Sequence, residues 1–170
     1  MVHLQHVSCL GNSNHTGAGR ALLPYLDAIP LSKCARNCTL PDDDEVRAVS
    51  AITHAHPTST EACVAMVHIA RDLIAGASPT DVAGDVAARP VDEVRSGGFV
   101  RDTFDAALWC LATTSSYAEC ALAAVNLGDD TDTTAAVAGA LAGIVYGIEG
   151  ILFEWLDKLQ GINAIEVCLF

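Results

Sequence analysis

Gly128-Asp129-Asp130-Thr131-Asp132-Thr133-Thr134 is a compact acidic turn that leads directly into the longest apolar tract of the sequence, residues 135–148. Aspartate and threonine are common at helix starts, where their oxygens accept hydrogen bonds from free backbone amides. A glycine just before them is typical of a turn. The stretch therefore predicts a turn that opens a long, buried helix.

Three glycines recur every four residues in that helix, at Gly139, Gly143 and Gly147. This spacing places them in one stripe, where a second helix can approach closely. In a membrane such a stripe favours dimerisation, but the tract is shorter than the roughly 20 residues that a bilayer requires. We therefore expect the stripe to pack inside a globular core rather than between molecules.

Helix-starting residues recur on the N-terminal side of the acidic turn. Residues 42–45, three aspartates and a glutamate, open one predicted helix, because carboxylates are favoured at the positive end of the helix dipole. Thr58 and Glu61 form a predicted capping box for the next helix, which Gly76 ends. Two helices are thus expected before residue 76.

Three further helix starts precede the acidic turn. Ser78-Pro79 predicts a short helix over residues 80–88, and Asp102 begins another. Ser116 and Glu119 form a second predicted capping box. Apolar residues recur at three and four positions, and the alternation typical of strands is absent. The sequence therefore predicts an all-α protein.

Length and composition restrict the domain organisation. A chain of 170 residues that is 51% hydrophobic can bury one sizeable core, so we expect a single domain. Residues 1–41 contain scattered glycines and prolines without a sustained period. We interpret them as an irregular N-terminal segment that precedes a helical domain over residues 42–170.

Charge and cysteine usage argue against several classes of partner. The chain has 21 acidic and 9 basic side chains, and its formal charge of -12 repels nucleic acid and anionic membrane surfaces. Its seven cysteines are odd in number, and no pair has the two-residue spacing of a zinc knuckle or redox turn. No secretory signal is visible. We expect a reduced, cytoplasmic protein that binds neither nucleic acid nor membrane.

The acidic turn also has the composition of a cation site. Asp130 and Asp132 lie two positions apart and Thr133 follows, so both carboxylates and a hydroxyl can meet at one point. Magnesium, or manganese as the alternative, prefers such oxygen ligands. Helix capping is the competing interpretation. Capping needs only one or two such residues, however, and three carboxylates within four positions repel one another unless a cation is bound.

Residues 128–136, followed by Ala138-Gly139, Gly143 and Tyr146-Gly147, resemble the C-terminal metal motif of the ADP-ribosylglycohydrolase family. Two further segments are similar in order and separation: Ile-Thr-His-Ala-His-Pro at 52–57, and Ser-Gly-Gly-Phe-Val at 96–100. The resemblance covers about residues 42–160. It implies an all-α, single-domain orthogonal helical bundle with a two-magnesium site.

The same resemblance implies roles for particular residues. Asp130, Asp132 and Thr133 match the family's metal ligands, whereas Asp129 stands where the family often has glycine. His54 is implied to lie near ADP-ribose, the alternative being a histidine that satisfies loop carbonyls. A zinc site of His54 with its neighbour His56 is disfavoured, because two ligands do not make a structural zinc site.

The glycine segment is implied to contact the ligand. Gly97 and Gly98 offer backbone without side chains, and the ring of Phe99 can stack on a nucleotide. Taken alone, two glycines and a phenylalanine are a common turn. Trp109 and Trp155 have helical core spacing, so we expect them to pack rather than bind. No catalytic residue is identified.

The implied function is magnesium-dependent hydrolysis of the N- or O-glycosidic bond between ADP-ribose and a protein side chain. The family takes half of its metal ligands from an N-terminal Thr-Asp-Asp segment, and no Thr-Asp-Asp precedes residue 130. We therefore expect an incomplete or truncated N-terminal part and one magnesium ion or none, with the activity of this chain alone left open. The alternative is an inactive ADP-ribose-binding or structural, crystallin-like helical module.

Overall fold

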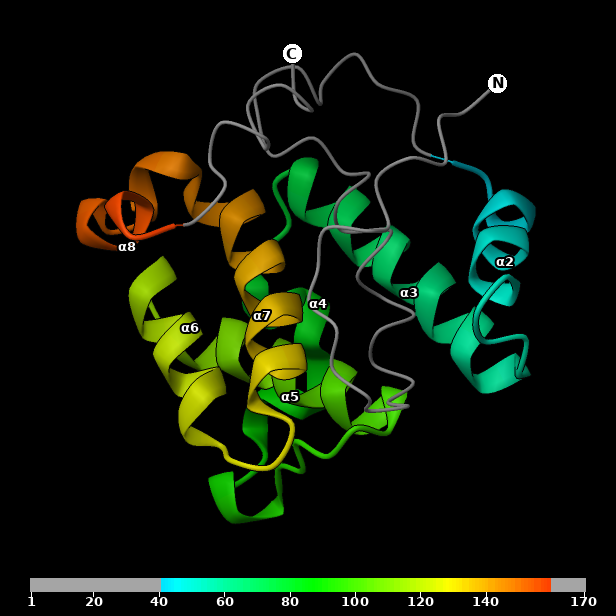
Figure 1. Ribbon diagram of the computed structural model, residues 1–170, viewed down its shortest axis with the longest axis horizontal. Coiled ribbons are helices and arrows are strands. Elements are labelled where there is room, and N and C mark those ends of the chain that lie inside the picture. Colours follow the sequence, from blue (N-terminus) through cyan, green and yellow to red (C-terminus); the bar gives the residue numbers. More distant parts are fainter. Residues whose placement is uncertain (1–40, 160–170) are drawn as a thin grey trace.

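The computed structural model describes residues 41–159 of the chain (Figure 1). The interpretation of residues 1–41 as an irregular segment lies almost entirely outside them. Seven α-helices make up most of the described part: α2 (Asp43–Ala51), α3 (Pro57–Ile74), α4 (Pro79–Ala83), α5 (Val100–Thr113), α6 (Tyr117–Asn126), α7 (Thr131–Tyr146) and α8 (Phe153–Asp157). Short 3-10 turns occur at Gly84–Ala88, Val91–Glu93 and Ile148–Gly150. Residues 41–159 contain no strand, which confirms the predicted all-α class.

Helix α7 lies at the centre of the described bundle and packs on α6, α5 and α3 (Figure 1). Its side chains Val137 and Leu141 are fully buried together with Leu111 of α5 and Met66 of α3. Burying each such side chain stabilises the fold by about 1.5–3 kcal/mol. The fold is therefore organised around the helix that follows the acidic turn.

The glycine stripe packs inside this core, as expected. Gly139 and Gly143 are buried within α7, and a Cβ added at Gly139 would lie only 3.2 Å from the Tyr117 hydroxyl of α6. Gly147 caps the end of the helix with a φ of 70°, a conformation that glycine adopts readily. Gly139 thus lets Tyr117 of α6 approach α7 closely.

The first predicted helix start is confirmed and the second is wrong. Asp42 caps α2 in a complete capping box with Glu45. Helix α3 instead begins at Pro57, and the Nδ1 of His56 accepts a hydrogen bond from the Thr58 amide at 3.2 Å. Proline is preset for the first helical position, so the helix starts earlier than the predicted Thr58 cap.

The remaining helix boundaries differ from prediction by small amounts. The helix predicted over residues 80–88 ends at Ala83, because Gly84 has a φ of 52° and the chain continues as a 3-10 turn. Helix α5 begins two residues before Asp102. At α6 the predicted box is half formed, since Ser116 caps the Glu119 amide while the Glu119 carboxylate accepts from Ser115.

The two tryptophans pack in the fold, as predicted. Trp109 donates its indole hydrogen bond to the Arg89 carbonyl at 2.9 Å. Trp155, in the short helix α8, meets the ring of Tyr117 edge to face with centroids 6.4 Å apart. Within the described part of the chain, no helix combines the length and the hydrophobicity needed to cross a bilayer.

Candidate metal centre

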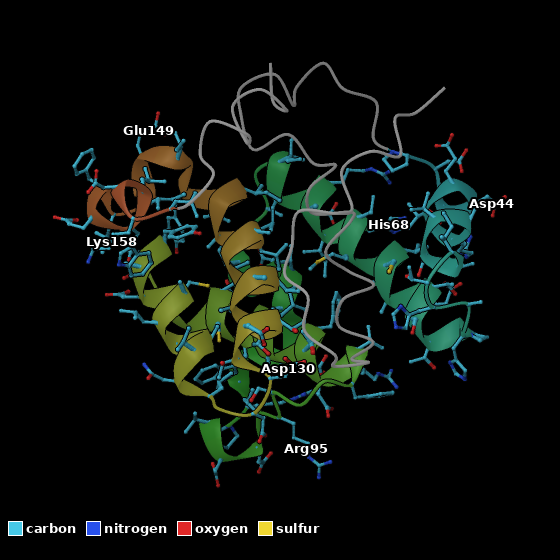
Figure 2. All side chains as sticks on the ribbon, in the orientation of Figure 1. Asp44, His68, Arg95, Asp130, Glu149 and Lys158 are labelled. Carbon is cyan, nitrogen blue, oxygen red and sulfur yellow. The ribbon has the colours of Figure 1, made fainter. Side chains whose placement is uncertain are left out.

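The acidic turn joins α6 to α7 in a tight reversal. Gly128 has a φ of 89° and Asp129 a φ of 55°, so two successive residues adopt the left-handed conformation. Asp130 follows as the N-terminal flanking residue of α7. Figure 2 shows Asp130 at this end of α7, with Glu149 beyond the opposite end of the helix. The turn thus presents its aspartates at one end of the central helix.

The carboxylate of Asp130 does not cap the helix. It makes no side-chain hydrogen bond to the amides of the first turn of α7. Instead, one of its oxygens accepts a hydrogen bond from the Thr133 hydroxyl at 2.9 Å. Thr133 is only 6% exposed, whereas Asp130 is half-buried. The capping interpretation therefore does not describe Asp130, and two of the three predicted ligands lie in contact.

Asp132, the third predicted ligand, lies exposed in the first turn of α7. With Asp130 and Thr133 it provides two carboxylates and one hydroxyl, a donor set whose chemistry fits a hard cation such as magnesium. Across residues 41–159, no group of three or more His, Cys, Asp or Glu side chains could hold a metal ion. A cation site at Asp130, Asp132 and Thr133 therefore stays a prediction.

The predicted glycine segment lies directly against this turn. The Asp130 amide donates to the Ser96 carbonyl at 3.1 Å, and the Ser96 hydroxyl donates to the Gly128 carbonyl at 2.9 Å. Ser96 is 2% exposed. Two segments that are about thirty residues apart in sequence are thus joined by two hydrogen bonds.

The residues after Ser96 are held by α5. The hydroxyl of Thr103, a fully buried residue, lies 3.1 Å from the Gly97 carbonyl and 3.3 Å from the Phe99 carbonyl. Gly98 lies between them and is half-buried. Phe99 is 55% exposed at the start of α5, with a ring that can stack on a ligand. The predicted ligand segment thus borders the predicted metal ligands.

Positive side chains flank this segment. Arg95 and Arg101 stand on either side of it, and both are exposed. Figure 2 shows Arg95 in the same part of the molecule as Asp130. Arg95 thus provides positive charge in the part of the molecule that holds the acidic turn, in a chain whose formal charge is -12.

His54 lies elsewhere in the described structure. It follows α2, its amide bonds to the Ser50 carbonyl at 2.9 Å, and its Nδ1 lies 3.1 Å from the Thr53 hydroxyl. Figure 1 shows the turn between α2 and α3 well apart from the turn between α6 and α7. The structure therefore does not bring His54 to the acidic turn, and its contact with ADP-ribose stays a prediction.

Sequence reasoning did not identify two buried side chains at the site. Ser96 stands immediately before the predicted ligand-binding pair Gly97-Gly98, and a polar residue at the start of a glycine turn is the sequence signal for such a role. Thr134 is fully buried, and its hydroxyl has no hydrogen-bond partner among the described residues. An unpaired buried hydroxyl next to the predicted ligand Thr133 is unusual, because buried polar groups are normally paired.

The described cysteines do not suit chemistry at this site. Cys110 and Cys120 are free and buried, and Cys63 is buried beside the Ser50 hydroxyl. Burial raises the pKa of the Cys110 thiol to about 12 and that of Cys120 to about 11. Because the thiolate is the reactive form, both side chains stay inert near neutral pH.

Comparison with known proteins finds relatives of the same family that the acidic turn and the glycine segment resemble. The family model described as ADP-ribosylglycohydrolase matches residues 39–169. The ADP-ribosylarginine hydrolase Tri1 of Serratia proteamaculans is 35% identical over 177 residues, which cover 92% of this chain and 47% of that protein. The ADP-ribosyl-[dinitrogen reductase] glycohydrolase of Rhodospirillum rubrum is 35% identical over 125 residues, covering 68% of this chain and 42% of the relative.

A solved structure, described as an ADP-ribosylglycohydrolase-related protein complex, superposes with a TM-score of 0.71 at 25% sequence identity. The superposition covers 94% of this chain and 60% of that chain. The chain therefore spans less than half the length of each of the two relatives above and somewhat more of the solved structure.

Proposed function

The chain belongs to the ADP-ribosylglycohydrolase family, and on this premise we propose that it acts in hydrolysing ADP-ribose from modified arginine side chains with a magnesium ion at Asp130, Asp132 and Thr133. The observation that carries the proposal is the Asp130 carboxylate, which is not committed to capping α7 and is bonded to the Thr133 hydroxyl at 2.9 Å. Manganese, which accepts the same oxygen donors, is the alternative metal.

The proposed reaction adds water across the bond between the anomeric carbon of ribose and an arginine nitrogen. Its products are ADP-ribose and the unmodified arginine side chain. A bound divalent cation would supply positive charge that polarises the oxygens of the ligand and stabilises charge that develops as the bond breaks. Arginine is proposed as the acceptor because the Serratia relative is named an ADP-ribosylarginine hydrolase.

The residues beside the acidic turn suit the other parts of ADP-ribose. The diphosphate carries negative charge, which the acidic turn would repel without a cation. The exposed Arg95 and Arg101, which flank residues 96–100 in the sequence, carry positive charge that would offset it. Phe99 offers an exposed aromatic face for stacking. A Cβ added at Gly97 would lie no closer than 3.8 Å to its nearest neighbour, so local packing alone does not require glycine there. A ligand that approaches the backbone at Gly97 would require glycine there.

The test is release of ADP-ribose from an ADP-ribosylated arginine peptide by the full chain, with magnesium and with a chelator. We expect release with magnesium, none with the chelator, and strong loss in Asp130→Asn. A serine-linked substrate serves as the comparison for O-glycosidic bonds. A second arm adds the N-terminal half of the Serratia relative in trans. Inactivity in both arms would overturn the proposed hydrolase.

A second candidate function is binding of ADP-ribose without hydrolysis. It is favoured by the absence, within residues 41–159, of a group of three or more acidic, histidine or cysteine side chains that could hold a metal ion. Calorimetry with ADP-ribose separates the two candidates. Binding without turnover in either arm supports a binding module, whereas no binding at all leaves the structural, crystallin-like alternative.

A further inference from the structure

Ser96 bonds to both sides of Asp129. Its hydroxyl donates to the carbonyl of Gly128, the residue before, at 2.9 Å. Its carbonyl accepts from the amide of Asp130, the residue after, at 3.1 Å. Ser96 is 2% exposed although it stands in the loop before α5. One buried residue therefore holds the backbone of the acidic turn from outside the turn.

The turn needs such support because its own conformation is unfavourable. Asp129 has a φ of 55°, which costs free energy for any residue with a Cβ. Asp130 has φ -88° and ψ 64°, outside the regular helical and extended regions, and its side chain makes no capping bond. The N-cap hydrogen bond that usually fixes the start of a helix is therefore not made by the Asp130 side chain.

Ser96 is itself anchored to the core. It is followed by Gly97, whose carbonyl accepts from Thr103, a fully buried residue of α5. A continuous set of bonds thus runs from α5 through Ser96 to Asp130, and from the Asp130 carboxylate to Thr133. Losing the Ser96 hydroxyl would release the Gly128 carbonyl and loosen the backbone that aims the Asp130 carboxylate.

We propose that Ser96 is a positioning residue, which sets the Asp130 carboxylate for cation binding through its bonds to the backbone of Gly128 and Asp130. This inference rests on the proposed function, because it assumes that the cation binds at Asp130. Ser96 touches neither cation nor ligand in this role. It acts through the turn.

The experiment measures the affinity of the full chain for Mn²⁺ alone, by electron paramagnetic resonance of the free ion, in the wild type and in Ser96→Ala. We expect Ser96→Ala to weaken Mn²⁺ binding about fivefold, the effect of one hydrogen bond of about 1 kcal/mol expressed in affinity. Amide hydrogen exchange at Asp130 in the metal-free protein should accelerate in the same variant.

Ser50→Ala is the matched control. Ser50 is also 2% exposed and its hydroxyl pairs with the Cys63 thiol, but it lies on α2, away from the acidic turn. The Ser50→Ala variant removes an equally buried hydroxyl, so we expect it to lower thermal stability while leaving Mn²⁺ affinity unchanged. Equal losses of Mn²⁺ affinity in the two variants would show a general structural effect and overturn the role of Ser96.

The outcomes separate the two proposals. A wild type that binds no Mn²⁺ overturns the proposed metal site, and the role of Ser96 with it. A wild type that binds Mn²⁺ with the same affinity as folded Ser96→Ala overturns the role of Ser96 alone. If Ser96→Ala does not fold, Ser96→Cys keeps a weak donor and should bind Mn²⁺ more weakly than the wild type. Unchanged affinity and Asp130 exchange in Ser96→Cys overturn the inference.

Discussion

Thr133 and Thr134 are adjacent buried threonines whose hydroxyls are in opposite situations. The Thr133 hydroxyl donates to the Asp130 carboxylate at 2.9 Å, whereas the Thr134 hydroxyl has no partner among the described residues. Leaving a buried hydroxyl unpaired costs about 1–3 kcal/mol. Thr134→Val keeps the shape of the side chain and removes that hydroxyl, so we expect it to stabilise the metal-free protein by about 1–2 kcal/mol.

For a chain of this length, 1 kcal/mol corresponds to a shift of about 2–4 °C in Tm. Thr134→Val should therefore raise Tm by roughly 2–8 °C, measured by calorimetry in the presence of a chelator. Thr133→Val is the matched control, because it makes the same chemical change one residue earlier. It removes a hydrogen bond to a charged group and should lower stability by about 1.5 kcal/mol. A loss of stability in Thr134→Val would refute the reasoning, since it would mean that the hydroxyl has a partner.

The remaining predictions concern the turn, the core thiol and the helix contact. Asp132→Asn should leave stability unchanged or slightly raised in chelator, because it relieves repulsion within the turn, and unfolding of the variant would contradict this. Burial raises the pKa of Cys110 to about 12. Its contribution to the free energy of unfolding is therefore complete below about pH 9 and falls as pH rises from 9 to 12, where the thiol ionises more readily in the unfolded chain. Denaturant titrations should show this decline, and Cys110→Ala should make it less steep, because Cys120, whose pKa is raised to about 11, still contributes. Gly139→Ala should destabilise the wild type, where the new Cβ meets the Tyr117 hydroxyl at 3.2 Å, but stabilise Tyr117→Phe by up to about 1 kcal/mol. Equal effects in the two backgrounds would show that the hydroxyl is not the obstacle.

Features that depend on neighbouring residues could be predicted from the sequence. The helix start predicted at residues 42–45 depends on four adjacent residues and forms as expected, and the structure adds a capping box between Asp42 and Glu45. At α3 a proline three residues after His54 started the helix before the expected cap, because the fixed φ of Pro57 competes with the preference of threonine for the cap. Such competition between adjacent signals makes the predicted boundaries of helices less accurate than their predicted number.

Features of the site that depend on tertiary contact could not be predicted in this way. The resemblance selected the glycine segment and the acidic turn separately, and the structure joins them through Ser96. A bond from a side chain to a backbone carbonyl about thirty residues away leaves no periodicity in the sequence. The unpaired hydroxyl of Thr134 is equally invisible, since burial and partners are set only when helices pack.

The most direct measurement is a Mn²⁺ titration of the full chain and of Asp130→Asn, with free Mn²⁺ followed by electron paramagnetic resonance and magnesium as competitor. A unit negative charge a few ångströms from a divalent cation contributes several kcal/mol at an effective dielectric constant of about 20. We therefore expect the wild type to bind Mn²⁺ in competition with magnesium, and Asp130→Asn to bind it more than about tenfold more weakly while remaining folded. Equal affinities in the two proteins, or unfolding of Asp130→Asn, would contradict a cation site in the acidic turn.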